Sequence, residues 1–489
     1  MVADIENPDL IRYNRDIAPT QDTQKNWTLY NYLSLWIGMS HNIPTYLMAG
    51  GFIALGMSWW QAILTVLVGN LIVLIPILLN SHPGTKYGIP FPVYARASFG
   101  VVGANLPALL RALVAAGWFG IETAIGGQAI QTFLLILIPG WAHFSALFTF
   151  VGMNLGGWIG FLLFWALNIW IIFHGIEAVR RFEAWAGPSV LALGIGLLIW
   201  AHTAAHGFGP MLAQPAKVHG AALWAIVIPS LTSVVGFWST LSLNIPDFTR
   251  FARSQKAQFW GQVLGLPTTM TVFSGIGVLV TSATIVVFHH AISDPIVLLG
   301  HFHNVFLLVI SMAAVVVATL SVNVAANVVS PAYDFIQLFP KRMTFARGGL
   351  LTGILGIVMV PWLLISNPHI YIYSWLDVYS GFLGPIAAIL IADYWVFRRQ
   401  TLAVLELYEK TGRYFYRNGV NGLAIWALVA GIVVSLIGKI VPPLVWLFNY
   451  SWFVGFVVSF VVYLLLMRGR QQPSALSAGV NDPVAAQKS

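Results

Sequence analysis

Apolar residues fill twelve stretches of the chain, most of them close to twenty residues long, and polar connections separate them. A helix of about twenty residues crosses the roughly 30 Å of hydrocarbon in a bilayer. The pattern therefore predicts an all-α integral membrane protein with twelve transmembrane helices. The expected spans are 27–56, 59–80, 103–136, 157–174, 186–204, 222–246, 263–290, 303–330, 348–366, 370–394, 419–441 and 451–467.

The composition excludes a soluble protein. Only 8% of the 489 residues are Asp, Glu, Lys or Arg, whereas a soluble protein carries about 25%. Hydrophobic residues make up 58%, and the mean hydropathy is +0.80. No connection is long enough for a globular catalytic domain, and the lack of cysteine excludes disulfides and thiolate metal sites. The residues before Trp27 lack the apolar core of a secretory signal peptide.

The positions of the basic residues predict the orientation. All but three of the 24 Lys and Arg residues, the exceptions being Arg111, Lys217 and Lys439, lie in the two tails and the even-numbered connections. The positive-inside rule therefore places the tails 1–26 and 468–489 in the cytoplasm, the second of them disordered. Orientation accounts for the net charge of +8 without a nucleic-acid partner. We expect a multi-pass protein of the plasma or bacterial inner membrane; a monomer is compatible with the sequence, which leaves the oligomeric state open.

Two of the expected spans contain residues that interrupt helices. Span 27–56 contains a polar run with a proline from Gly38 to Pro44, and span 222–246 contains Pro229 followed by Gly236-Phe237-Trp238. Breaks at matching positions of two halves are typical of transporters built on inverted repeats. The alternative is that Pro and Gly are simply common in membrane helices. The repeats would be 27–204 and 222–394, followed by two further spans in 419–467.

Polar side chains also occur inside the eighth span. Ser321, Asn323 and Asn327 lie in an otherwise apolar helix, and the two asparagines are four residues apart on one face. Interhelical hydrogen bonding would explain any one of them. Together, opposite two broken helices, they favour a binding site.

Glu122 is the most informative single residue. An ionised carboxylate at mid-membrane costs about 2.5 to 3.5 kcal/mol even on the mildest scale, so Glu122 needs a partner or a proton. Pairing with Arg111 is the structural alternative, although eleven residues separate the two by about three helical turns. We therefore expect Glu122 to take up and release a proton in a transport cycle.

Two tryptophans lie close to this polar set. Trp118 is one turn before Glu122, and Trp238 is just beyond the expected break in the sixth span. Most tryptophans of membrane proteins belong to interfacial belts, but two at mid-depth would stack on the faces of a flat ring.

Other titratable residues give weaker indications. Asp377 is either a gate residue or an interfacial residue near the outer surface, and His41 is more typical of a hydrogen-bonded core residue than of a ligand. We predict no metal site and no cofactor, because the spacing of the remaining candidates is loose. Those candidates are His289, His290, His301 and His303.

The chain resembles the nucleobase:cation symport-1 family, and within it the bacterial allantoin permease branch, which is related to hydantoin and uracil permeases. The likeness extends from about Trp27 to Phe456. The matching stretches are HNIPTY with the following GG, GTKYGIPFPV with RASFG, LNIPDFTRFA, SVNVAANVVSPAYD, LGPIAAILIADYW and SWFVG.

The resemblance implies a leucine-transporter-like fold with spans 1 to 5 and 6 to 10 as inverted repeats and two appended helices. It implies symport of a planar amide heterocycle with H⁺ or Na⁺. Trp118 and Trp238 match the stacking tryptophans, Asn327 and Asn42 match the ring-edge amides, and Glu122 stands where glutamine is usual. The implied sodium site takes backbone carbonyls at Gly38, His41 and Ala318 and hydroxyls at the positions of Ser321 and Val322.

Two departures from the family pattern change the expected coupling. Val322 offers no hydroxyl, and a dehydrated sodium ion needs a full set of oxygens. Glu122 in place of glutamine allows a proton to be carried. We therefore expect a secondary active importer of allantoin or a close relative, coupled to protons rather than to sodium.

Three alternatives stay open. A uracil, cytosine or hydantoin permease of the same family would present similar amide edges to the site. A membrane enzyme is a remote alternative because the sequence lacks a nucleophile with its base, a metal cluster or a phosphate loop. A channel is equally remote, because stacking tryptophans suit an occluded organic ligand better than a stream of ions.

Overall fold

The structure, a computed structural model, describes residues 11–174, 191–302, 304–367 and 369–469. Arg180, Arg181, His303, the start of the fifth expected span and the outer parts of both tails lie outside these residues. The described chain is mainly helical, and its two named strands form one short antiparallel hairpin, in which β1 (Thr149–Phe150) pairs with β2 (Met153–Asn154).

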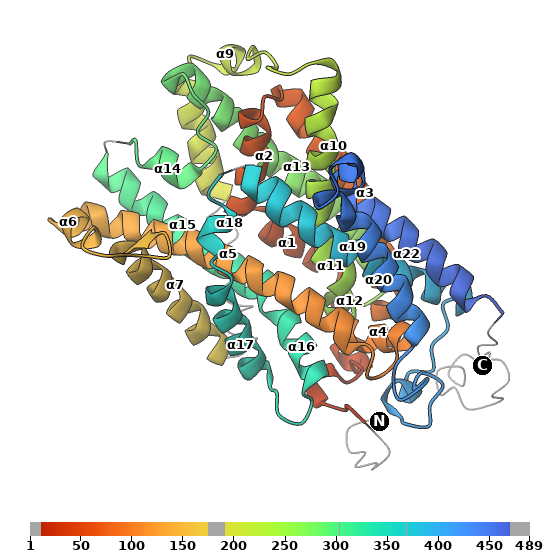
Figure 1. The fold of residues 1–489 in the computed structure, drawn as a ribbon. Coiled ribbons are helices and arrows are strands. Elements are labelled where there is room, and N and C mark those ends of the chain that lie inside the picture. Colours follow the sequence, from red (N-terminus) through yellow and green to blue (C-terminus); the bar gives the residue numbers. More distant parts are fainter. Residues whose placement is uncertain (1–10, 175–190, 303, 368, 470–489) are drawn as a thin grey trace.

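The first half forms long helices joined by short ones (Figure 1). Its elements are the 3₁₀ turns Arg15–Ile17 and Asp22–Gln24, α1 (Leu29–Ser40), α2 (Ile43–Ala54), α3 (Trp59–Tyr87), α4 (Phe91–Phe99), α5 (Asn105–Leu137), α6 (Trp141–Ser145), α7 (Leu155–Phe173) and the helix Leu191–Ala204.

The second half follows the same pattern. Its first helices are α9 (Phe208–Leu212), α10 (Gly220–Phe237), α11 (Ser239–Asn244), α12 (Pro246–Thr249), α13 (Gln255–Phe288), α14 (Pro295–Leu299), α15 (Val305–Asn327), α16 (Val329–Leu338), α17 (Phe345–Val358) and α18 (Pro361–Leu364). The next helix, α19 (Asp377–Ile391), has the π-helical segments Ile370–Leu376 and Ala392–Phe397 on either side of it. The last elements are the helices α20 (Gly422–Leu436), α21 (Val445–Asn449) and α22 (Ser451–Met467) and the 3₁₀ turns Leu405–Tyr408, Ile437–Lys439 and Pro442–Leu444.

Within the described residues, eight helices are long and apolar enough to cross a membrane, or nine if the bent pair Pro442–Asn449 and Ser451–Met467 is one span. Each of these coincides with an expected span. The expected spans 27–56, 186–204 and 348–366 contain shorter helices instead. The first is divided into α1 and α2, the second holds the helix Leu191–Ala204, and the third holds α17.

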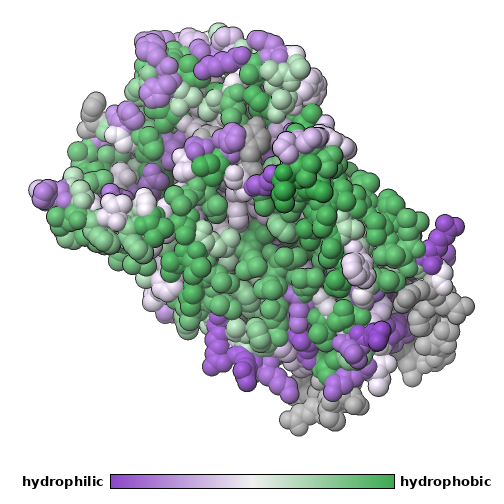
Figure 2. Space-filling model, viewed as in Figure 1, coloured by the Kyte–Doolittle hydropathy of each residue, from purple (hydrophilic) through white to green (hydrophobic). Residues whose placement is uncertain are grey.

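The surface of the bundle carries a hydrophobic flank. Figure 2 shows apolar side chains over most of this face and hydrophilic ones gathered toward its two ends. Large apolar side chains at the surface of the protein are strongly exposed, among them Ile75 at 60% and Trp426 at 69%. An apolar patch of this extent is stable only against lipid, which agrees with the membrane assignment from the sequence.

Both ends of the described chain lie at the same end of the bundle, the N-terminal end near α16 and the C-terminal end after α22 (Figure 1). The N-terminal segment is bound there by buried and partly buried hydrogen bonds. The Arg12 guanidinium donates to the Gln337 carbonyl (2.6 Å), Asn14 Nδ2 donates to the Pro340 carbonyl (2.9 Å), and Arg250 Nε donates to Thr20 Oγ1 (2.5 Å). This segment therefore packs as part of the folded bundle.

Candidate functional site

The first span is broken between α1 and α2. His41 ends α1 with φ −86° and ψ 71°, and Asn42 has the extended φ and ψ values of a helix N-cap. Asn42 Oδ1 accepts from the Thr45 N–H (2.7 Å), and its Nδ2 donates to the Met39 carbonyl (2.5 Å). Both polar atoms of the Asn42 amide, the predicted ring-edge amide, therefore have partners in the structure. Asn42 caps the start of α2 and forms hydrogen bonds with backbone groups at the break.

The sixth expected span is also broken, at a later residue than Pro229. Pro229 lies inside α10, which continues to Phe237; Trp238 (φ −99°, ψ 6°) separates α10 from α11. Ser233, one turn after Pro229, has its Oγ 2.9 Å from the Pro229 carbonyl. The Trp36 and Trp238 rings meet edge to face with centroids 5.1 Å apart, which brings α1 against the second break.

Trp118 lies in an aromatic cluster on α5. Its ring contacts Phe237 with centroids 4.9 Å apart, and it also contacts Tyr371, Trp375 and Tyr379 at 6.1 to 6.4 Å, all edge to face. The last three residues are four apart in sequence, so they lie on one face of the tenth span. That spacing was a readable signal which the sequence analysis did not use.

Trp238 lies on the other side of Phe237. The Phe237 and Trp238 rings have centroids 4.9 Å apart at an angle of 71°, and Trp238 Nε1 donates to the sulfur of Met270 (2.8 Å). Each of the two predicted stacking tryptophans thus packs against the same phenyl ring. Phe237 is a site residue that the sequence analysis missed.

Glu122 is buried in α5 with 2% of its surface exposed. Its Oε2 is buried and has no hydrogen-bond partner within the described part of the chain. The guanidinium of Arg111 instead contacts Asp334 of α16, with Nη1 and Oδ2 3.3 Å apart and both side chains fully buried. Pairing with Arg111 therefore does not account for Glu122, and its free oxygen is a polar group available to a proton or a ligand.

The amides of α15 lie against α5 at Phe119 and Thr123. Asn323 Nδ2 is 3.2 Å from both the Phe119 carbonyl and Thr123 Oγ1, and Asn327 Nδ2 donates to Asn323 Oδ1 (3.2 Å). Asn323 acts as an interhelical hydrogen-bond donor, as the structural alternative expected. The hydrogen bond to Asn323 holds the Asn327 side chain in place. The amide oxygen of Asn327 takes no part in that bond, so it can accept from another donor.

The residues of the implied sodium site lie on α1, at its end and on α15, two helices that contact each other. The His41 ring packs edge to face on Phe273, with centroids 5.0 Å apart. Ala318, Ser321 and Val322 are buried on α15, and Gly38 is partly buried on α1. Within the described chain there is no group of three or more His, Asp or Glu residues that could hold a metal ion. The carbonyl ligand set stays a prediction.

Asp377 lies inside the helical bundle. It is fully buried at the start of α19, where Ser233 Oγ of α10 donates to its Oδ1 (2.6 Å). The hydroxyl of Ser451 in α22 donates to its backbone carbonyl (2.7 Å). Asp377 thus joins the tenth span to α10 and α22, and its role as a gate stays a prediction.

Comparison with known proteins gives consistent matches over nearly the whole chain. The family model described as "Permease for cytosine/purines, uracil, thiamine, allantoin" matches residues 19–455. An allantoin permease of Bacillus subtilis is 43% identical over 93% of both chains. The purine-uracil permease NCS1 of Arabidopsis thaliana is 42% identical over 95% of this chain and 80% of its own length.

A solved structure shares the fold. Mhp1, a nucleobase-cation-symport-1 family transporter solved in a closed conformation with bromovinylhydantoin bound, matches with a TM-score of 0.78. The match covers 94% of this chain and 95% of Mhp1 at 24% sequence identity. The fold is accordingly the leucine-transporter-like fold expected from the sequence.

Proposed function

The chain belongs to the nucleobase:cation symport-1 family of secondary transporters, and on this premise we propose that it imports allantoin or a closely related planar amide heterocycle by alternating access. The observation that carries the proposal is the buried carboxyl group of Glu122, which has an oxygen without a partner and lies one helical turn from Trp118, whose ring contacts Phe237. Aromatic faces bind a flat ring, and a carboxylate accepts hydrogen bonds from its N–H groups.

The substrate assignment follows from the chemistry of Glu122 and from the relatives. A protonated carboxyl offers one donor and one acceptor, as an amide does, so it fits an amide edge of the substrate; the ionised form, which only accepts, would favour an edge with two N–H donors, such as a ureido group. The Bacillus subtilis relative is named an allantoin permease, and allantoin carries a ureido group on a hydantoin ring. Uracil, cytosine and hydantoins are the alternative substrates within the same family.

The architecture we propose has twelve spans, with repeats at 27–204 and 222–394 and two further spans within 419–467. Both tails, 1–26 and 468–489, would be cytoplasmic, because the basic residues gather in the connections at that end. Support for this arrangement comes from the two helix breaks, one in each proposed repeat, and from the shared end of the bundle at which the described chain begins and ends.

For the coupling ion we propose a proton held by Glu122. Val322 supplies only an apolar side chain at a position where the sodium site would need a hydroxyl, whereas Glu122 has an oxygen without a partner. The substrate site would be completed by Trp238, Asn327 and Asn42. Asn42 would act indirectly, because its hydrogen bonds fix the backbone at the break between α1 and α2. Asp377 would act as a gate between the tenth span and α10.

The test is uptake of labelled allantoin into cells that lack their own carrier, with unlabelled uracil, cytosine, hydantoin and thiamine as competitors. We expect saturable accumulation of chemically unchanged allantoin above the empty-vector control, inhibited by hydantoin. Absence of allantoin uptake with the protein present in the membrane would overturn the substrate assignment. Uptake that does not saturate would favour a channel, and recovery of altered substrate would favour an enzyme.

A further inference from the structure

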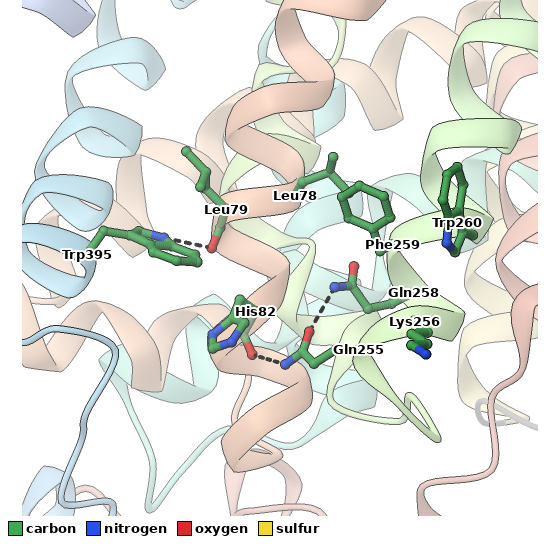
Figure 3. A pocket seen from close by; sticks show the side chains of 9 residues that line it. All are labelled: Leu78, Leu79, His82, Gln255, Lys256, Gln258, Phe259, Trp260 and Trp395. Carbon is green, nitrogen blue, oxygen red and sulfur yellow. Dashed lines mark hydrogen bonds between the residues drawn. The ribbon is translucent and has the colours of Figure 1, made fainter.

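A cavity of about 320 Å³ opens on the flank of the bundle, away from the candidate transport site. It lies where the end of α3, the start of α13 and the π-helical segment Ala392–Phe397 meet (Figure 3). Its walls are apolar and aromatic, formed chiefly by Leu78, Phe259, Trp260 and Trp395. The volume is in the range of small-molecule sites.

The first wall of this cavity continues a face of α3 that points outward. Leu64, Val68, Leu71 and Ile75 are 42 to 60% exposed and recur every three or four residues. Leu78, Leu79 and His82 continue the same spacing into the cavity. In a membrane-spanning helix such an exposed apolar face lies against acyl chains, so the cavity opens toward hydrocarbon.

The second wall is an outward face of α13. Trp260, Leu264 and Val272 are 50, 46 and 60% exposed, and Lys256 precedes Trp260 by one turn on the same face. A tryptophan one turn inside a lysine at the end of a span is typical of the interface between hydrocarbon and headgroups. The cavity therefore extends from hydrocarbon depth to headgroup depth.

Lys256 makes the polar rim of the cavity cationic. It is exposed, and the described part of the chain offers it no ion pair. None of the nine lining residues is Asp or Glu. A charge of this kind near a membrane surface attracts anionic headgroups.

Hydrogen bonds between the helices hold the walls in place. Trp395 Nε1 donates to the Leu79 carbonyl (3.2 Å), and Gln255 Nε2 donates to the His82 carbonyl (3.0 Å). Gln258 Nε2 in turn donates to Gln255 Oε1 (2.9 Å). The dashed lines in Figure 3 mark these three contacts. The first two join α3 to the π-helical segment and to α13, and the third lies within α13.

We propose that this cavity binds an anionic phospholipid, with an acyl chain along Leu78 and Trp260 and the phosphate at Lys256. The bound lipid would fill the space between α3, α13 and the end of the tenth span. The inference is independent of the transported substrate, because no residue of the aromatic cluster around Trp118 lines the cavity.

Native mass spectrometry of the full chain in detergent tests the proposal. The probes are phosphatidylglycerol, phosphatidylethanolamine with the same acyl chains, and glycerol phosphate. We expect phosphatidylglycerol to bind in preference to phosphatidylethanolamine, and Lys256→Gln to weaken its binding about fivefold, the effect of one basic residue near a surface. Lys256→Arg should bind like the original protein, and so should Lys341→Gln, which removes another exposed lysine.

A second measurement examines the acyl part of the site. Brominated phosphatidylglycerol quenches nearby indoles, so the original protein should lose more fluorescence than Trp260→Phe does. Equal phosphatidylglycerol binding by Lys256→Gln and the original protein would overturn the proposal. Competition by glycerol phosphate would do the same, because it would identify a site for a soluble phosphate rather than for a lipid.

Discussion

The phenyl ring of Phe237 packs edge to face against the indole of Trp118, with ring centroids 4.9 Å apart and planes at 65°. Phe237 is the last residue of α10, directly before the break at Trp238, whose indole it also contacts. A flat substrate that stacks on both indoles must share this space with the phenyl ring. Phe237 is therefore a candidate determinant of which ring sizes the site accepts.

Shortening this side chain is expected to change selectivity. Phe237→Leu keeps an apolar side chain but loses the aromatic contacts, which are worth about 0.5 to 1.5 kcal/mol each. We expect the half-saturation concentration for allantoin to rise between twofold and tenfold, while hydantoins with bulky substituents become better inhibitors. Competition uptake assays on cells with matched surface expression measure both changes. Unchanged inhibition by every ring would show that Phe237 does not limit the site.

The proton hypothesis for Glu122 predicts a change in pH dependence. If transport needs the protonated carboxyl, uptake should decline as external pH rises, because the protonated fraction falls. Glu122→Gln mimics the neutral form, so it should transport without that pH dependence and without concentrating substrate against a gradient. Uptake and accumulation ratios measured between pH 5 and pH 8 test this. If Glu122→Gln still concentrates substrate with unchanged pH dependence, the proton hypothesis is wrong.

Glu406→Gln is the matched control for this experiment. Glu406 lies outside the membrane-spanning segments and accepts from the Arg413 guanidinium (2.7 Å). These hydrogen bonds hold the pKa of the Glu406 carboxyl below its ordinary value, so it stays ionised over the tested range. The same chemical substitution at this position should leave the pH profile of uptake unchanged.

The buried pair of Arg111 and Asp334 predicts strong coupling in stability. Removing one partner leaves an uncompensated charge, which typically costs about 3 to 5 kcal/mol, whereas replacing both by apolar residues is often close to neutral. We expect Asp334→Leu to lower the unfolding temperature of the purified protein markedly and Arg111→Met/Asp334→Leu to recover most of the loss. Additive losses in the double variant would contradict this expectation.

The gate role of Asp377 predicts an effect on transport rate. Asp377→Ala removes the acceptor for Ser233 Oγ and loosens the contact between the tenth span and α10. We expect the maximal uptake rate to fall at least tenfold, with a smaller change in the half-saturation concentration. Ser233→Ala should reproduce part of the loss because it removes the donor of the same hydrogen bond. A normal rate in Asp377→Ala would exclude the gate role.

The sequence predicted the long helices and the two breaks because both depend on local composition. Hydrophobic runs of sufficient length and a polar run with proline are visible without tertiary contacts. The second break falls at Trp238, at the end of the stretch that the sequence marked, while Pro229 at the start of that stretch is accommodated within α10. Proline marks a place where a helix is weak, and the packing around it decides where the helix ends.

The individual roles of site residues were less accessible. Asn42 reads as a free amide in the sequence, but the backbone around it determines that both its polar atoms cap the break. Arg111 and Asp334 are 223 positions apart, and no local pattern connects them. Glu122 was identified because a single carboxyl group in an apolar span is conspicuous whatever surrounds it.

The bound N-terminal segment sets a limit on how far the chain can be shortened. Arg12 contacts Gln337 of α16, and Asn14 contacts Pro340 in the turn after that helix. Thr20 accepts a hydrogen bond from Arg250, which directly follows α12. The smallest unit that keeps these contacts therefore begins near Ile11, well before the first residue of α1. Tags or fluorescent reporters belong ahead of that point, because a fusion joined directly to Trp27 would replace part of the folded protein.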